Sequence, residues 1–219
     1  MNPEEKHYKT QKTGRYYISK PHSEINENIK KLVFVLHGYA QLAKDFIQEF
    51  DFLNNDETLI IAPEGLSRFY SKNVIAASWM TKEDRDNEID DYLFYLEGIA
   101  NQILSHLPGK SEEIVVLGFS QGVHTAARFA VCTEMNVNKL ILCSSDFPQD
   151  ADFDSLREKN QSGQQMKVYY IFGDKDRNIR LENFEKSINM LNENNIVFEK
   201  IMFDGEHVVD VESVKKILS

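Results

Sequence analysis

The chain has 219 residues with 25 Lys and Arg against 35 Asp and Glu, which gives a formal net charge of −10. This charge argues against a nucleic-acid partner, because phosphate binding requires clustered Lys and Arg. No apolar stretch approaches the length of a membrane span, and residues 1–5 are too polar for a signal peptide, so we expect a cytoplasmic protein. The length and a hydrophobic content of 42% fit one α/β domain over residues 1–219.

Strand-like and helix-like segments alternate along the chain. A hairpin around Thr13-Gly14 is expected first, and a long loop follows the strand at 58–62. The expected strands lie at 31–36, 58–62, 114–117, 139–145, 166–172 and 197–203, and the expected helices at 40–53, 85–106, 123–130, 181–194 and 208–218. This alternation predicts a mostly parallel central sheet with helices on both faces. The segment 147–165 is too short for a lid domain, so we expect an open, shallow site.

A Gly-x-Ser-x-Gly motif follows the apolar run at 114–117. Its fixed positions are Gly118, Ser120 and Gly122, and the Ala-rich stretch after it favours helix. A strand that enters a helix through this motif is the nucleophile elbow of α/β-hydrolases. The tight turn exposes the serine hydroxyl, and the glycines leave room for the strand and the helix to approach each other. We therefore expect an α/β-hydrolase fold with Ser120 as the nucleophile.

An elbow serine requires an imidazole that takes its proton and a carboxylate that orients the imidazole. In this fold the order along the chain is Ser, then Asp or Glu, then His. His207 is the sole histidine after the elbow helix, and it follows the strand at 197–203. Asp174 and Asp176 both follow the strand at 166–172 and are candidate acids. The Gly-x-x-Asp spacing that many hydrolases have selects Asp176, with Asp174 as its neighbour or a loop cap.

Acyl transfer also requires hydrogen-bond donors for the developing oxyanion, usually backbone N–H groups. One is expected from Gln121, the residue after the nucleophile, where the helix dipole favours negative charge. The other is expected from Tyr39, in the loop after the strand at 31–36. His37, at the end of that strand, is interpreted as a residue that pins the loop by hydrogen bonding and takes no part in catalysis.

Other polar and aromatic residues receive structural interpretations. Cys132 and Cys143 lack the spacing of metal ligands and are expected to be small core residues. The acidic stretch at 83–91 could hold a divalent cation, but it is better explained as a helix start that complements the dipole, so no metal site is expected. Trp79 and Phe147 are candidates for the wall of a substrate pocket, with ordinary packing as the alternative.

Six short motifs follow one another along the chain: L-H-G-Y-A at 36–40, A-P-E-G at 62–65, S-W-M at 78–80, G-F-S-Q-G at 118–122, F-G-D-K-D at 172–176 and D-G-E-H-V at 204–208. In these motifs and their order the chain resembles the phospholipase/carboxylesterase family of α/β-hydrolases, which includes acyl-protein thioesterases. The resemblance implies a triad of Ser120, Asp176 and His207, an oxyanion hole from Tyr39 and Gln121, and hydrolysis of carboxylic esters or thioesters without a cofactor. Ala40, Arg177-Asn178-Ile179 and Glu206 depart from the family's usual residues.

These features predict a serine carboxylesterase that acts on short- to medium-chain carboxylic esters or thioesters of small molecules through an acyl-enzyme intermediate. An amidase or peptidase on the same scaffold is the alternative, because one fold hosts many reactions. A non-catalytic binding module is a further alternative, which the intact triad disfavours. An open site with an apolar rim is also compatible with a homodimer.

Overall fold

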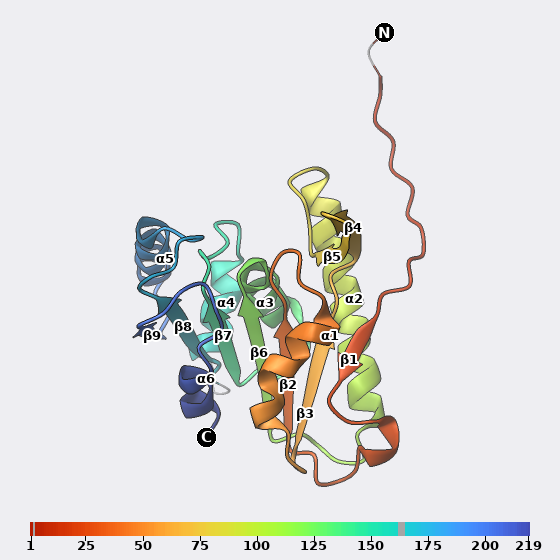
Figure 1. Ribbon diagram of the computed structural model, residues 1–219, viewed down its shortest axis with the longest axis vertical. Coiled ribbons are helices and arrows are strands. Elements are labelled where there is room, and N and C mark those ends of the chain that lie inside the picture. The colour runs from red at the N-terminus through yellow and green to blue at the C-terminus, as the bar shows by residue number, and fades with distance from the viewer. Residues whose placement is uncertain (2, 162–164) are drawn as a thin grey trace.

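The computed structural model describes residues 1, 3–161 and 165–219, and in these residues seven strands form the central sheet (Figure 1). The strand order is β1-β3-β2-β6-β7-β8-β9. β1 pairs with β3 in antiparallel orientation and the other neighbours pair in parallel, which confirms the expected α/β-hydrolase architecture. The strands are β1 (Tyr16–Ile18), β2 (Lys31–Leu36), β3 (Thr58–Pro63), β6 (Glu113–Phe119), β7 (Lys139–Cys143), β8 (Lys167–Gly173) and β9 (Phe198–Phe203).

Buried side chains alternate between the two faces of the sheet, as the period of a strand requires. In β2, Phe34 faces one hydrophobic cluster, whereas Val33 and Val35 face the other. The first cluster is covered by α2 (Arg85–His106), α3 (Gln121–Cys132), α4 (Phe153–Gln161) and α5 (Leu181–Glu193). The second is covered by α1 (Ala43–Phe46), the 3₁₀-helix η2 (Ile47–Leu53) and α6 (Val211–Leu218). Helices therefore lie on both faces, as expected.

A β-hairpin occupies part of the segment that the sequence predicts to be a long loop. Its strands β4 (Ser67–Ser71) and β5 (Val74–Ser78) pair in antiparallel orientation outside the central sheet (Figure 1). The two turn residues, Lys72 and Asn73, have φ values of 49° and 67°, which matches the twist of a two-residue hairpin turn. Lys-Asn is a weak signal for such a turn, so the hairpin was missed.

Three other expectations about the elements were wrong. Instead of forming a hairpin around Thr13-Gly14, the N-terminal segment contributes β1, whose Tyr17 pairs with Ala62 at the edge of β3. The helix expected at 40–53 is the short α1 followed by η2. The last helix begins at Val211, because the Asp210 side chain caps it by accepting a hydrogen bond from the N–H of Ser213.

Two further expectations concern buried positions and the insertion at 147–165. Cys143 is buried as expected, but Cys132 is exposed at the end of α3, so its placement in the core was wrong. The insertion contains α4, whose Leu156 is fully buried against the core. Residues 162–164 of the insertion lie outside the described residues.

Among the described residues, no helix combines the length and the apolar character needed to cross a bilayer.

Candidate active site

The turn between β6 and α3 holds Ser120 in a strained conformation. Ser120 has φ 52° and ψ −122°, although a residue with a Cβ disfavours positive φ at a cost of about 1–3 kcal/mol. Its N–H donates to the carbonyl oxygen of Cys143 at 2.9 Å, which fixes the turn to the end of β7. The serine therefore lies at the carboxyl edge of the sheet, at the N-terminus of a 12-residue helix.

The two motif glycines permit the close approach that the turn requires. A Cβ on Gly118 would lie 2.3 Å from the carbonyl oxygen of Gly122, and a Cβ on Gly122 would lie 2.1 Å from the carbonyl oxygen of Leu36. Both distances are far below van der Waals contact. The sequence interpretation of these glycines as spacers between strand and helix is confirmed.

A continuous chain of hydrogen bonds joins Ser120, His207 and Asp176. The Nε2 atom of His207 lies 3.0 Å from the Ser120 Oγ, and its Nδ1 lies 2.7 Å from the Asp176 Oδ2. The other carboxylate oxygen of Asp176 accepts hydrogen bonds from the N–H groups of Asn178 and Ile179, at 2.8 and 3.0 Å. The Asp176 side chain is fully buried, and that of His207 is 17% exposed.

Asp174, the other candidate acid, makes a different contact. Its Oδ1 accepts a hydrogen bond from the N–H of Gly205 at 3.2 Å, and the residue is exposed. This contact ties the loop after β8 to the loop after β9, which carries His207. The His207 ring also packs at 4.9 Å, centroid to centroid, against that of Phe119, so the imidazole is held from two sides.

His37 pins the loop after β2, as the sequence analysis expected. Its Nδ1 donates to the carbonyl oxygen of Gly38 at 2.7 Å, and its Nε2 accepts from the N–H of Gly65 at 3.0 Å. This pattern assigns the proton to Nδ1. Burial lowers the pKa of His37, so its ring is neutral, and both ring nitrogens are occupied by structural hydrogen bonds.

The end of β5 connects the loop after β2 to the elbow. The carbonyl oxygen of Ala77 accepts from the N–H of Ala40 at 2.9 Å, and the indole Nε1 of Trp79 donates to the carbonyl oxygen of His37 at 2.8 Å. The side-chain amide of Gln121 reaches the same segment. Its Nε2 donates to the Met80 carbonyl oxygen at 2.9 Å, and its Oε1 accepts from the N–H of Trp79 at 3.1 Å. We call residues 77–80 the bridge segment.

The backbone N–H groups of Tyr39 and Gln121 have no acceptor among the described residues. Tyr39 lies between Gly38, whose N–H donates to the Gln41 side chain, and Ala40, whose N–H donates to Ala77. The N–H of Gln121 lies in the first turn of α3, where the dipole favours an anion. The Tyr39 side chain is 60% exposed and stacks on the Phe69 ring of β4 at 5.3 Å between ring centroids. Gly38, the residue before Tyr39, lies close to the serine, because a Cβ on Gly38 would be 3.1 Å from the Ser120 Cβ.

Trp79 and Phe147 lie in the packed core, and each has about 1% of its surface exposed to solvent. Trp79 packs between the rings of His37 and Tyr92, at centroid distances of 5.0 and 6.3 Å, and Phe147 packs against Phe153 at 5.7 Å. The structure thus places them as packing aromatics, the alternative to a pocket wall. What the sequence analysis missed at this point is the Gln121 side chain and its contacts with the bridge segment, for which no local pattern gives a signal.

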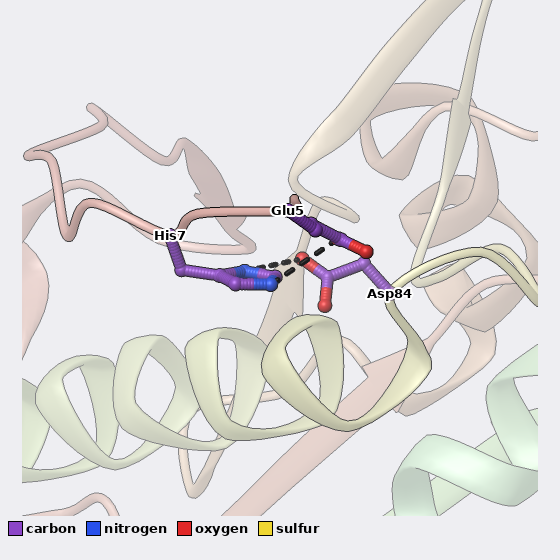
Figure 2. Close-up of side chains that lie close together, drawn as sticks. All are labelled: Glu5, His7 and Asp84. Atoms are coloured by element: carbon purple, nitrogen blue, oxygen red, sulfur yellow. Dashed lines mark ion pairs between the residues drawn. The ribbon is translucent and has the colours of Figure 1, made fainter. Parts of the chain in front are cut away.

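A group of potential metal ligands forms where the N-terminal segment meets the start of α2. Glu5, His7 and Asp84 lie close together in Figure 2, with their ligand atoms within 4.8 Å of one another. The Nε2 of His7 lies 3.2 Å from the Oε1 of Glu5, and its Nδ1 lies 3.5 Å from the Oδ2 of Asp84. All three side chains are exposed, and exposed ion pairs of this kind are common at protein surfaces and weak. The sequence analysis considered the acidic stretch that contains Asp84, but not its meeting with His7.

The fold and the elbow geometry define an α/β-hydrolase. The family model described as Phospholipase/Carboxylesterase matches residues 22–219, and the chain belongs to this family. Among solved structures, the chain is similar to acyl-protein thioesterase 2 of Zea mays, with 18% identity, a TM-score of 0.65, and coverage of 94% of this chain and 96% of that one. It is also similar to the Bacillus cereus carboxylesterase, with 15% identity, a TM-score of 0.65, and coverage of 93% and 91%. No curated protein matches the sequence.

Proposed function

We propose that this protein is a serine carboxylesterase that hydrolyses short- to medium-chain carboxylic esters or thioesters of small molecules, with residues 1–219 acting as one catalytic domain. The observation that carries the proposal is the hydrogen-bonded chain from Ser120 through His207 to Asp176. Membership of the family supports an ester or thioester as the substrate. The cytoplasmic location and the homodimer stay predictions of the sequence.

In the first step His207 acts as the general base. Its Nε2 takes the proton of the Ser120 hydroxyl, and the Oγ attacks the carbonyl carbon of the substrate. The bond from His207 Nδ1–H to the buried Asp176 fixes the tautomer with a free Nε2 lone pair and stabilises the imidazolium that forms. His207 then donates the proton to the leaving oxygen or sulfur. Water next attacks the acyl carbon while His207 takes its proton, and His207 returns this proton to the Ser120 Oγ as the acid is released.

The tetrahedral intermediate carries a negative oxygen that requires donors. We assign this role to the backbone N–H groups of Tyr39 and Gln121, whose lack of an acceptor among the described residues supports the assignment. The bridge segment holds both groups, since it bonds to Ala40 beside Tyr39 and to the Gln121 side chain. Donors fixed before the reaction need no reorganisation when the charge develops.

A groove beside Tyr39 supports an apolar acyl group of limited length. The groove has a volume of about 580 Å³, and its lining includes Ala40 together with polar and charged residues such as Lys44, Asp45 and Glu49. Apolar side chains of the β4–β5 turn and of the segment after β2 contribute to it: Val74, Ile75, Leu42 and Phe46. Val74 and Ile75 are 67% and 48% exposed, and burying them against an acyl chain would be favourable.

Hydrolysis of p-nitrophenyl esters from acetate to palmitate, by the wild type and by Ser120→Ala, tests the proposal. We expect turnover with an optimum at short or medium chain length, and a loss of about 10⁴-fold or more in kcat for the variant. Thermal unfolding of both proteins checks that the variant is folded. Wild-type turnover that survives in a folded Ser120→Ala protein would contradict the proposal.

A further inference from the structure

A second histidine–aspartate pair lies next to the proposed catalytic triad. His124 is in α3, one helical turn after Ser120, and Asp146 is in the loop that follows β7. The Nε2 of His124 lies 3.0 Å from the Asp146 carbonyl oxygen and 3.1 Å from its Oδ1. The triad uses neither residue.

The loop after β7 borders both Ser120 and His207. Ser120 donates its N–H to Cys143, the last residue of β7, and the hydroxyl of Ser144 donates to the carbonyl oxygen of Val208 at 3.2 Å. Asp146 follows two residues later. Because β6 lies between β2 and β7 in the sheet, this loop flanks Ser120 on the side opposite to the loop of Tyr39.

The next pair along α3, Arg128 and Asp150, differs in how fully its carboxylate is bonded. Arg128 donates to Asp150 Oδ1 at 2.6 Å, and Arg85 donates to Asp150 Oδ2 at 2.6 Å, so both carboxylate oxygens are occupied. The Arg128 side chain is 6% exposed. These contacts anchor the end of the loop to α2 and α3, with little of the arginine left in contact with solvent.

The His124–Asp146 pair is open by comparison. Asp146 Oδ1 accepts from His124 and from the Ser145 hydroxyl, whereas its Oδ2 has no partner in the described part of the chain. The Nδ1 atom of His124 likewise has no hydrogen-bond partner among the described residues. The Asp146 side chain is 42% exposed and the His124 side chain is 30% exposed. The hydrogen bond from His124 lowers the pKa of Asp146, so the carboxylate carries its charge at neutral pH.

We propose that His124 and Asp146 form a substrate subsite that binds a positively charged group of the ester or thioester, such as an ammonium. The inference rests on the proposed function, because the subsite acts on the substrate of Ser120. A charged carboxylate oxygen that has no partner among the described residues, on a loop that borders Ser120, attracts a cation, and partial exposure admits it. On the opposite side of Ser120, the loop of Tyr39 leads to the groove at Ala40, where Val74 and Ile75 offer apolar surface, so the two sides of the carbonyl would receive chemically different substituents.

The test compares matched pairs of substrates that differ only in charge. β-Alanyl and butyryl p-nitrophenyl esters place an ammonium or a methyl on the acyl side, and butyrylthiocholine and its 3,3-dimethylbutyl thioester analogue do so on the leaving-group side. For each pair the ratio of kcat/KM, charged over neutral, is measured in the wild type and in Asp146→Asn. The asparagine retains an oxygen that can accept from His124, and dividing the two ratios cancels the intrinsic reactivity of the substrates.

We expect Asp146→Asn to lower the ratio at least tenfold for one of the two pairs, mainly through KM, with less than threefold change for the neutral substrates. Two controls separate recognition from other effects. Glu206→Gln removes an exposed charge beside His207 and is expected to change the ratio less than threefold. Asp150→Asn breaks the fully bonded pair with Arg128 and is expected to lower the melting temperature without changing the ratio.

The outcomes distinguish the two proposals. Hydrolysis that depends on Ser120, with ratios unchanged in folded Asp146→Asn for both pairs, would overturn the subsite and leave the esterase proposal standing. An equal fall of the ratio in Glu206→Gln would also overturn it, because the effect would then be the general field of the protein. No hydrolysis of any substrate that depends on Ser120 would overturn both proposals.

Discussion

The two sides of Ser120 that serve the proposed reaction are held by different means. On the β2 side, buried His37 and Trp79 hold backbone groups of Gly65 and of the loop after β2 through hydrogen bonds between segments far apart in the sequence. On the side of β8 and β9, the side chains of Asp176 and His207 project from short loops at the strand ends, with exposed Asp174 as a tie between the loops. Where backbone donors are used, the fold must fix the chain itself; where side chains are used, correct placement at a strand end is sufficient.

The largest effect is expected from the side-chain half of the site. His207→Ala removes the proposed base, and we expect kcat for a p-nitrophenyl ester to fall by about 10⁴-fold or more, since the serine alone is a weak nucleophile. His106→Ala serves as the matched control, because His106 is exposed and its contacts, with Gln102, Ser105 and the ring of His22, lie outside the proposed site. Comparable rates for His207→Ala and wild type would show that this half of the site does no chemistry.

The two carboxylates of the loop after β8 should behave differently. Asp176→Asn removes the acceptor of His207 Nδ1–H, and we expect a loss of about 10³- to 10⁴-fold in kcat because the imidazole tautomer is no longer fixed. Asp174→Asn retains an oxygen for the Gly205 N–H and should cost less than tenfold. Steady-state kinetics of both variants decide the assignment, and the reverse order of losses would make Asp174 the acid.

An intermediate effect is expected from the bridge segment. Gln121→Met keeps the size of the side chain but removes its bonds to Trp79 and Met80, so the Gln121 N–H loses its exact placement. We expect kcat to fall about 10- to 100-fold with little change in KM, since one poorly placed oxyanion donor costs less than a deleted one.

Asn160 provides the matched control for this variant. Its side chain also clamps backbone groups, with bonds to Met166 and Val197 at 2.9 Å, but it lies in α4, outside the proposed site. Asn160→Leu should destabilise the fold by about 1–3 kcal/mol and leave kcat unchanged for the folded protein. An equal fall in kcat for both variants would show that the bridge segment contributes to the stability of the fold and not to the placement of the oxyanion donors.

The smallest effect concerns Ala40, one of the residues that depart from the family's usual pattern. It has φ 64°, a left-handed conformation that a Cβ disfavours by about 1 kcal/mol. Ala40→Gly should raise the melting temperature by about 1–3 °C after the entropy of glycine in the unfolded chain is offset. Ala151→Gly, at a position without positive φ, should lower it. A lower melting temperature for Ala40→Gly would show that the loop is not strained there.

The same contrast explains which features could be predicted. Ser120, Asp176 and His207 each follow an apolar strand pattern, so a local signal and the rule that sites lie at the carboxyl ends of parallel strands were enough to bring them together. The parallel sheet followed from the same alternation. Asp174 and Asp176 differ by only two positions, and it is the hydrogen bonds of Asp176 to His207, Asn178 and Ile179 that separate them.

What the sequence did not reveal depends on contacts between distant segments. The Gln121 side chain meets residues about 40 positions earlier, and His124 meets a loop 22 positions later. The two strands of the β4–β5 hairpin are joined by Lys72-Asn73, which is an atypical residue pair for such a turn. The sequence around an aromatic residue does not indicate whether its side chain is buried or lines a pocket. Both interpretations of Trp79 are therefore compatible with the sequence, and its packing against His37 distinguishes them.

The account depends most on a covalent intermediate at Ser120. The direct measurement is to mix the wild type with a p-nitrophenyl ester, quench in acid during turnover, and map the acylated peptide by mass spectrometry. We predict one acyl group on Ser120 in the wild type, and none on that peptide in Ser120→Ala. Turnover without acylation of Ser120, or with the acyl group on another nucleophile such as exposed Cys132, would contradict the mechanism.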